Sequence, residues 1–255
     1  MDKKKNNFLE ERLKKRYIQY TPEIASYWDA IIDWDKRKEG EGDFFVDHLK
    51  KIKAKKILDM SCGTGYDSVR LLGEKYKVKS CDGNLFMLTK SRINAEDHKV
   101  NLKAKFCDWE RLKRAYKDKF DAVICLGDAF CHIFEKEKRL DILKQIYSLL
   151  RKGGIFIVDQ RNFDKILRGD YSSKHKYVYC GIQLDTKFKK KTRDHLIIIH
   201  KLGRLKFEFN VYPIRFKEMI ELLSRTGFKV STFGDFSKRF KFSTPDFFQH
   251  ICIKK

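Results

Sequence analysis

Apolar and polar positions divide most of the chain into two kinds of segment. Strand-like segments occupy residues 55–60, 77–82, 101–109, 120–127 and 155–160. Between them, apolar residues recur every three or four positions, which is typical of helices, at 66–76, 84–97 and 136–154. Gly153 and Gly154 are expected to end the last of these helices. Strands that alternate with helices predict a parallel sheet with helices on both faces.

The two ends of the chain follow other patterns. Residues 1–50 are predicted to be helical, with Thr21 as an N-cap and Pro22 in the first turn. Near residue 215 a helix begins, which Gly227 ends. The remaining segments predict antiparallel strands, with a hairpin turn at Gly203, over 176–184, 186–192, 195–203, 204–212, 229–236 and 246–255. We therefore predict an α/β, Rossmann-like sheet in one domain over 51–255, with a helical N-terminal cap over 1–50 and an antiparallel β-rich insertion at about 170–212.

Composition narrows the class of protein. The chain has 255 residues and a formal net charge of +22, but its lysines and arginines are spread along the sequence. Charge alone therefore makes nucleic acid an alternative partner rather than the leading one. Seven cysteines without a CxxC pair indicate reduced thiols in a cytoplasmic protein, with no metal site. No apolar run has the length of a membrane span, so we expect no membrane partner.

A glycine-rich turn is the most informative local feature. The stretch "ILDMSCGTG" joins a predicted strand to a helix and holds Gly63 and Gly65 one residue apart. Such a turn exposes main-chain N–H groups at the floor of a crevice. Asp82 ends the next strand, where a carboxylate accepts both hydroxyls of a ribose. Asp108 and Trp109 end the third, where they suit an adenine amino group and a purine face. The pattern predicts an adenosine-bearing ligand without a pyrophosphate.

These motifs, in this order, resemble those of the class I S-adenosylmethionine-dependent methyltransferases. The stretches "DAVICLGDAFCHI", "DQRNFD" and "PDFFQH" are more specifically similar to glycine N-methyltransferases and glycine/sarcosine N-methyltransferases. The resemblance implies S-adenosylmethionine as the cofactor and a small amine with a carboxylate, of the glycine, sarcosine or dimethylglycine type, as the substrate. It leaves open whether the chain forms a homo-oligomer.

Arg161 and Asp128 are the residues that bear most on the substrate. Arg161 follows the fifth strand, and its planar guanidinium suits a carboxylate; the resemblance assigns it to the substrate carboxylate. The alternative is a structural ion pair with Asp159 or Asp164. Asp128 stands where family members usually carry an asparagine. We expect it to face the amine, where it attracts a cation and repels a carboxylate.

The resemblance places further residues at the site. Ser61 and Gly63 are expected along the methionine part of the cofactor, Leu126 near the sulfonium, His132 near the substrate, and Arg37 on the cofactor carboxylate. Trp28 is expected to cover the cofactor, and Tyr179 and Tyr212 to supply hydroxyls near the amine. RNA or DNA methylation is the alternative function, but the N/D-P-P-Y/F motif that many base methyltransferases carry after the fourth strand is replaced here by "LGDAF".

Overall fold

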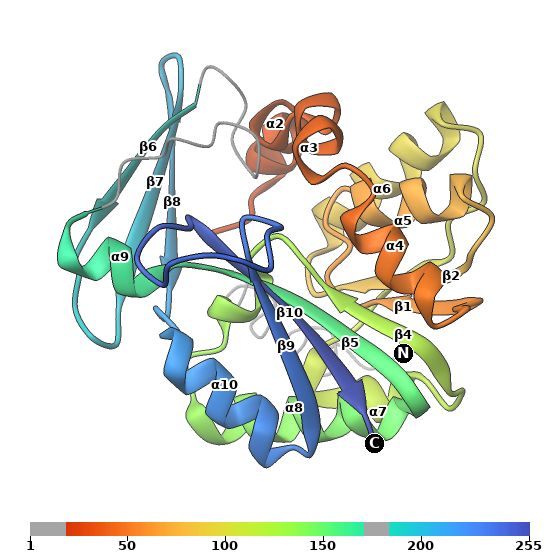
Figure 1. Cartoon of the computed structure of the whole chain (residues 1–255). Coiled ribbons are helices and arrows are strands. Elements are labelled where there is room, and N and C mark those ends of the chain that lie inside the picture. The colour runs from red at the N-terminus through yellow and green to blue at the C-terminus, as the bar shows by residue number, and fades with distance from the viewer. Residues whose placement is uncertain (1–18, 171–183) are drawn as a thin grey trace, which may run out of the picture.

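The computed structural model describes residues 19–170 and 184–255. Its centre is a seven-stranded sheet in the order β3-β2-β1-β4-β5-β10-β9 (Figure 1). The first five strands in this order are parallel, and β10 runs antiparallel to both β5 and β9. The strands are β1 (Lys56–Asp59), β2 (Lys77–Asp82), β3 (Ala104–Phe106), β4 (Phe120–Cys125), β5 (Leu150–Arg161), β9 (Phe228–Gly234) and β10 (Phe247–Lys254). This arrangement confirms the predicted Rossmann-like sheet.

Helices cover both faces of this sheet. On one face lie α4 (Phe44–Lys51) and α5 (Tyr66–Gly73), whose apolar side chains pack on alternate residues of β1, β4 and β5. The opposite face packs against α8 (Lys136–Leu149) and α10 (Phe216–Arg225). The remaining helices of this part are α6 (Leu85–Asp97), α7 (Leu112–Ala115) and α9 (Phe163–Arg168). Two 3₁₀ turns are η1 (Trp109–Arg111) and η2 (Ala129–His132).

A second layer stands over the sheet's carboxyl edge. Here α2 (Pro22–Ile32) and α3 (Trp34–Glu41) lie near a separate antiparallel sheet of β6 (Leu184–Lys189), β7 (Leu196–Leu202) and β8 (Leu205–Val211) (Figure 1). Ile24 and Ile31 of α2 share one apolar cluster with Phe207 and Phe209 of β8. As predicted, Thr21 caps α2, since its hydroxyl accepts the Ile24 N–H at 3.3 Å. Residues in 1–18 and 171–183, among them most of the predicted strand at 176–184, lie outside the described part.

Two predicted boundaries are wrong. The helix predicted over 136–154 ends at Leu149, because Leu150 pairs with Phe120 and so already belongs to β5. Gly153 and Gly154 lie inside this strand, where its register with β4 shifts. The third strand is limited to Ala104–Phe106, and Asp108 caps η1 directly after it. Among the described residues, no helix has the length and apolarity needed to cross a membrane.

Candidate active site

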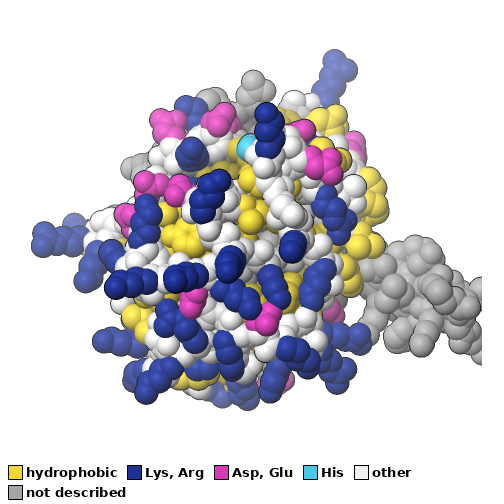
Figure 2. Space-filling view, turned by 90° about the vertical axis from the view of Figure 1, so that its right-hand side faces the viewer, with side chains coloured by type: hydrophobic (Ala, Val, Ile, Leu, Met, Phe, Trp, Pro, Cys, Tyr) yellow, Lys and Arg dark blue, Asp and Glu magenta, His cyan; other side chains and the backbone are white. Residues whose placement is uncertain are grey.

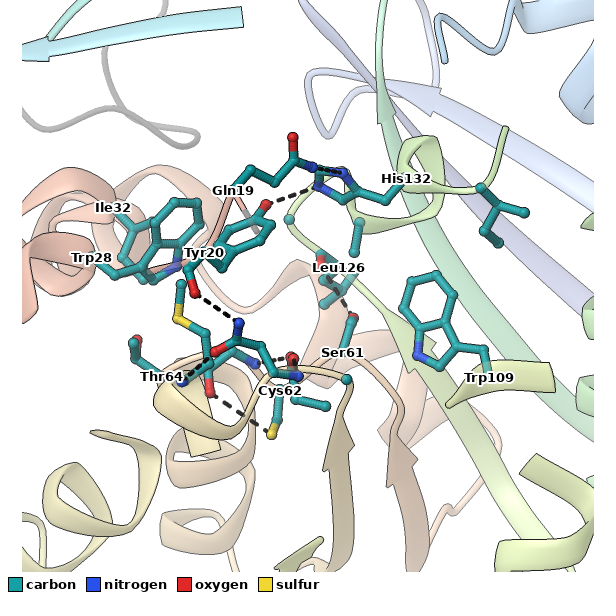
Figure 3. A pocket seen from close by; sticks show the side chains of 18 of the residues that line it. Gln19, Tyr20, Trp28, Ile32, Ser61, Cys62, Thr64, Trp109, Leu126 and His132 are labelled. Carbon is teal, nitrogen blue, oxygen red and sulfur yellow. Dashed lines mark hydrogen bonds between the residues drawn. The ribbon is translucent and has the colours of Figure 1, made fainter. Parts of the chain in front are cut away.

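A cavity of about 620 Å³ lies over the carboxyl ends of β1, β2, β4 and β5. Its size is typical of small-molecule sites. The segment before α2, helix α2 itself and the small sheet close it from above. Figure 3 shows Tyr20 projecting into its middle, with Trp28 and Ile32 on one side and Trp109 on the other. Ten residues of the predicted site line this cavity: Trp28, Arg37, Ser61, Gly63, Asp82, Asp108, Trp109, Leu126, His132 and Arg161.

The glycine turn and Asp82 form the floor of the cavity. Gly63 adopts a φ of 50°, which L-residues rarely tolerate, and its N–H donates to Asp82 Oδ2 at 2.8 Å. The N–H of Asn84 donates to the other oxygen of Asp82, also at 2.8 Å. Burial raises the pKa of Asp82 to about 6 against these hydrogen bonds, which favour the ionised form. The carboxylate is therefore oriented into the cavity by two main-chain donors and retains acceptor capacity for a ligand.

A second carboxylate supports the turn from below. Asp59, at the end of β1, accepts the Ser61 N–H at 3.2 Å and the Ser68 hydroxyl at 2.6 Å. Ser68 in turn bonds to Ser80 of β2 at 2.7 Å. Burial raises the pKa of Asp59 to about 7. This acidic residue of the "ILDMSCGTG" stretch thus holds the turn against β2 from a position outside the cavity lining.

Trp109 and Asp108 lie at the far end of the cavity. The indole Nε1 donates to the Met60 carbonyl at 2.5 Å, and the ring stacks on Phe130 with centroids 6.3 Å apart. These contacts hold the indole in one orientation beside the floor. The Asp108 carboxylate accepts the Glu110 N–H at 3.1 Å as the cap of η1. Both residues therefore occupy the position at the end of β3 that the motif order predicts.

Arg161 and Asp128 are neighbours at the ends of β5 and β4, as predicted. The Arg161 side chain is only 5% exposed, and its Nε lies 3.2 Å from Asp128 Oδ2. The other oxygen of Asp128 accepts the Arg161 main-chain N–H at 3.1 Å. The guanidinium also lies over the Phe247 ring, 4.9 Å from its centroid. Arg161 thus presents a positive charge at the cavity wall, with Asp128 behind it.

Asp128 corrects one expectation. It is not among the described residues that line the cavity, so it does not face a ligand there as predicted. Its carboxylate points back to Arg161, because Asp159 accepts the N–H groups of Gly127 and Asp128 and pulls the loop toward β5. Burial raises the pKa of Asp128 to about 6, although Arg161 lowers it. The two alternative partners that the sequence suggested for Arg161 have other contacts. Asp159 accepts the Asp128 N–H, and Asp164 accepts from Arg215.

His132 reaches the cavity from η2. Its Nε2 lies 2.8 Å from the Tyr20 hydroxyl, and its Nδ1 lies 3.2 Å from Gln19 Nε2 (Figure 3). Burial lowers the pKa of His132 to about 4, so the ring is neutral at physiological pH. The Tyr20 carbonyl accepts the Asn84 amide at 2.8 Å, which ties this segment to the cavity floor.

Arg37 lines the cavity but is already paired. Its Nε donates to Glu41 at 2.6 Å and its Nη2 to Asp67 at 2.9 Å, and its guanidinium lies 4.3 Å from the Tyr66 ring centroid. This network joins α3 to the start of α5. Trp28, Ser61 and Leu126 also line the cavity, with the Ser61 hydroxyl 3.4 Å from the Leu126 carbonyl.

Two more predicted residues lie outside the cavity lining, and a third is not among the described residues. Gly65 is not among the described lining residues; its φ is 103°, and a Cβ there would approach Ser91 Cβ to 3.2 Å, so it serves close packing of α5 on α6. Tyr212 is likewise outside the lining, because its hydroxyl donates to Glu218 at 3.2 Å and its ring packs against Arg139. Tyr179 lies outside the described residues.

Sequence reasoning missed several lining residues. Gln19, Asn84 and Asn210 carry no motif, and His200 lies on β7 within an apolar run. Burial lowers the pKa of His200 to about 3, and its Nδ1 lies 3.0 Å from the Thr186 hydroxyl. A polar residue on an otherwise buried strand was the available signal for His200. Gln19 and Asn84 are brought to the cavity by loops and Asn210 by strand β8, and the sequence does not disclose where these segments meet the cavity.

Comparison with known proteins agrees with this geometry. Residues 51–205 match the family model described as "Methyltransferase domain". The chain is 38% identical to the glycine/sarcosine N-methyltransferase of Halorhodospira halochloris and 36% identical to that of Aphanothece halophytica. The alignments cover 93% and 92% of this chain and 89% and 90% of those proteins.

A solved structure supports the fold independently. An S-adenosylmethionine-dependent methyltransferase from Clostridium acetobutylicum superposes with a TM-score of 0.70, over 91% of this chain and 97% of that one, at 15% identity. The fold, the motif order and the curated relatives agree. The chain is a member of the S-adenosylmethionine-dependent methyltransferase family, within the group that contains the glycine/sarcosine N-methyltransferases.

Proposed function

We propose that this enzyme transfers the methyl group of S-adenosylmethionine to the nitrogen of a small amino acid of the glycine type. The observation that carries the proposal is the buried guanidinium of Arg161 in the cavity wall. A planar, permanently charged group at this depth suits a carboxylate, which it binds through two hydrogen bonds. The names of the relatives, glycine/sarcosine N-methyltransferases, support the same substrate class.

The cofactor fits the floor and far end of the cavity by its chemistry. Asp82 would accept the ribose hydroxyls, Asp108 the adenine amino group, and Trp109 would lie against the adenine ring. The main chain at Ser61 and Gly63 would line the methionine part. The cofactor supplies an electrophilic methyl group on a sulfonium, so the protein needs no covalent nucleophile and acts by positioning.

Arg37, Trp28 and Leu126 complete the proposed cofactor site. Arg37 would bind the cofactor carboxylate with the part of its guanidinium that faces the cavity, while Glu41 and Asp67 hold the side chain in place. Trp28 and Leu126 would enclose the region of the sulfonium. In this arrangement α2 and α3 close over the bound cofactor, and the amine enters on the side of Arg161 and His132.

The positive charge of the protein does not point to a nucleic-acid substrate. Among the described lining residues, Arg37 and Arg161 are the lysine and arginine side chains, and both are buried in ion pairs. The other cations lie outside: Figure 2 shows lysines and arginines spread over a whole face, with acidic side chains among them. The cavity is therefore selective for a small anion rather than for a phosphate backbone.

The test is methyl transfer from labelled S-adenosylmethionine to glycine, sarcosine, dimethylglycine or total tRNA in parallel. We expect label in at least one of the amino acids, with retention of activity after nuclease treatment. Label in tRNA with none in any amino acid would overturn the proposal. An Asp82→Ala variant serves as the control for transfer that depends on this site.

A further inference from the structure

The Gln19 side chain links the small sheet to the cavity. Its Oε1 accepts the main-chain N–H of Asn210 at 2.7 Å, and its Nε2 donates to the Asn210 carbonyl at 3.3 Å. Only one orientation of the amide satisfies both main-chain groups, so strand β8 determines which end is nitrogen. The second proton of Nε2 then points to His132 Nδ1, 3.2 Å away. The Asn210 carbonyl, which also lies near the ring, already accepts from Gln19 Nε2, so we take Nδ1 as the acceptor of this second proton.

This arrangement selects one tautomer of the imidazole. With Nδ1 accepting, the single ring proton of neutral His132 lies on Nε2 and is donated to the Tyr20 oxygen at 2.8 Å (Figure 3). The hydroxyl proton of Tyr20 must then point away from His132. Within residues 19–170 and 184–255, His132 is the hydrogen-bond partner found for this hydroxyl, and Tyr20 lines the cavity.

We propose that Gln19 is a positioning residue for methyl transfer: by selecting the Nε2–H tautomer of His132, it turns the Tyr20 hydroxyl proton toward the cavity, to be donated to the substrate carboxylate beside Arg161. The inference rests on the proposed amino acid substrate. A carboxylate is the acceptor that the chemistry allows, because a donor aimed at the amine would occupy the lone pair that must attack the methyl group.

The electrostatic surroundings agree with a neutral pair. The ionisable groups that act on Tyr20 are Asp82 of β2, Asp128 and Cys131 of the loop after β4, and Arg161 of β5. Burial raises the pKa of Tyr20 well above its usual value, so the hydroxyl keeps its proton. Among described residues, the ring nitrogens of His132 contact Gln19, Tyr20 and the main-chain carbonyl of Asn210, and none of these groups is a charged side chain.

Gln19→Glu is the sharpest test because it preserves shape and replaces the Nε2 donor with an acceptor, which reverses the bond to His132 and removes the bond to the Asn210 carbonyl. Glutamate still accepts the Asn210 N–H, but it presents an acceptor to His132 Nδ1. The ring proton then moves to Nδ1, so that Nε2 accepts the Tyr20 proton and the cavity loses its donor. Below the pKa of His132 in this variant, the doubly protonated ring again donates from Nε2, and the Tyr20 proton points to the cavity.

The first measurement is the ¹⁵N NMR signature of the histidine rings, with His132 assigned by its loss in a His132→Asn variant. We expect the Nε2–H tautomer in the wild-type protein and the Nδ1–H tautomer in Gln19→Glu at alkaline pH. An Nδ1–H tautomer in the wild-type protein would overturn the inference. This readout needs no turnover, so it stands apart from failure of the proposed function.

The second measurement is kcat/KM for the amino acid at saturating cofactor, from about pH 6 to about pH 9. The kcat/KM of Gln19→Glu, divided by that of the wild type, should fall as pH rises. At the alkaline end we expect a loss of about tenfold or more, which is the size expected for a lost hydrogen bond to a charged group. Gln19→Met, which only removes hydrogen bonds, should give a loss that does not vary with pH. In a Tyr20→Phe background, Gln19→Glu should have no further effect; an equal loss there would refute action through Tyr20.

Discussion

Buried carboxylates define the site at the scale of single residues. Asp59, Asp82, Asp128 and Asp159 stand at the ends of adjacent strands or their loops, and burial raises the pKa of each, to about 7, 6, 6 and 8. Each is stabilised in its ionised form by main-chain N–H donors. Of the four, Asp82 lines the cavity, so the charge that a ligand meets there changes near pH 6.

Cofactor affinity should depend on the ionisation of Asp82. The ionised carboxylate is the acceptor for two hydroxyls, so binding favours it and should weaken as pH falls through about 6, with a proton released on binding near that pH. Asp82→Ala removes both hydrogen bonds to the ribose, each worth roughly 1.5–3 kcal/mol of binding free energy. It should also abolish the fall in cofactor affinity at acid pH. Calorimetry across pH measures both effects. An unchanged affinity in Asp82→Ala would remove this residue from the cofactor site.

Arg161→Lys should raise KM for the amino acid and leave cofactor affinity nearly unchanged. The lysine keeps the charge but loses the planar fork that binds a carboxylate twice. Steady-state kinetics and calorimetry on the same preparation separate the two quantities, and Arg225→Lys, at an exposed arginine of α10, is a matched control. Loss of cofactor binding in Arg161→Lys would instead assign the residue to the cofactor or the core.

Asp128→Asn tests the partner of this arginine. The amide can still accept the Arg161 main-chain N–H. Because it carries no charge, it no longer neutralises the guanidinium, which then attracts the substrate carboxylate more strongly. We expect a lower KM for the amino acid and a changed preference among glycine, sarcosine and dimethylglycine, with turnover retained. Loss of all methyl transfer in a folded Asp128→Asn protein would show an essential role for the carboxylate itself.

At the scale of elements, the cavity is formed by strand ends of the central sheet and by the short helices above them. The parallel strands bring the glycine turn, Asp82 and Arg161 to one edge because their carboxyl ends coincide there. The helices above are joined to that edge by polar contacts as well as by an apolar cluster, in which Ile31 of α2 packs with Tyr66 and Met87. Asp29 of α2 accepts from Thr64 and Asn94, and Arg37 of α3 binds Asp67 of α5.

Arg37→Met should destabilise the protein strongly. Glu41 is nearly inaccessible to solvent and pairs with Arg37 at 2.6 Å, so removal of the guanidinium leaves a buried carboxylate without its closest cation. Such losses cost about 3–5 kcal/mol. Urea unfolding of the cofactor-free protein measures this. The double variant Arg37→Met with Glu41→Gln should recover part of the loss, whereas equal stability of the single and double variants would show that the pair contributes little.

At the scale of the whole molecule, charge and catalysis are spatially separate. Exposed lysines such as Lys53, Lys75, Lys77 and Lys103 lie on the outside, and they contribute to a net charge of +22. The cavity is lined instead by aromatic, apolar, amide and carboxylate side chains, with two paired arginines. A large net charge raises solubility and attracts anions in general, without selecting one.

Methyl transfer to an amino acid should therefore proceed without nucleic acid and depend only weakly on salt. Contacts with duplex phosphates would give a slope of about −0.9 per contact in a log–log plot of binding against salt. Titration of labelled duplex and of tRNA at several salt concentrations measures this slope, beside kcat/KM for the amine under the same conditions. Tight binding that tRNA alone converts into turnover would reverse the assignment.

The sequence by itself determined the parts of this protein that depend on local pattern. Apolar periodicity located the strands and helices of the central sheet, and the residues at strand ends, Asp82, Trp109 and Arg161, could be placed because parallel strands present their carboxyl ends together. The glycine turn could be predicted because its conformation requires glycine. Gly63 has a positive φ, and Gly65 packs too closely on Ser91 for most side chains. Family resemblance supplied the substrate class.

Only the tertiary structure decided which polar side chains meet. Gln19 bonds to His132, 113 positions away, and to Asn210, 191 positions away, and no local pattern encodes such contacts. The same holds for Asp128, which the loop anchored by Asp159 directs toward Arg161, and for Tyr212, which Glu218 and Arg139 hold outside the cavity. The physical reason is that burial makes each polar group find a partner, and the chain's path through space determines which partner is within reach.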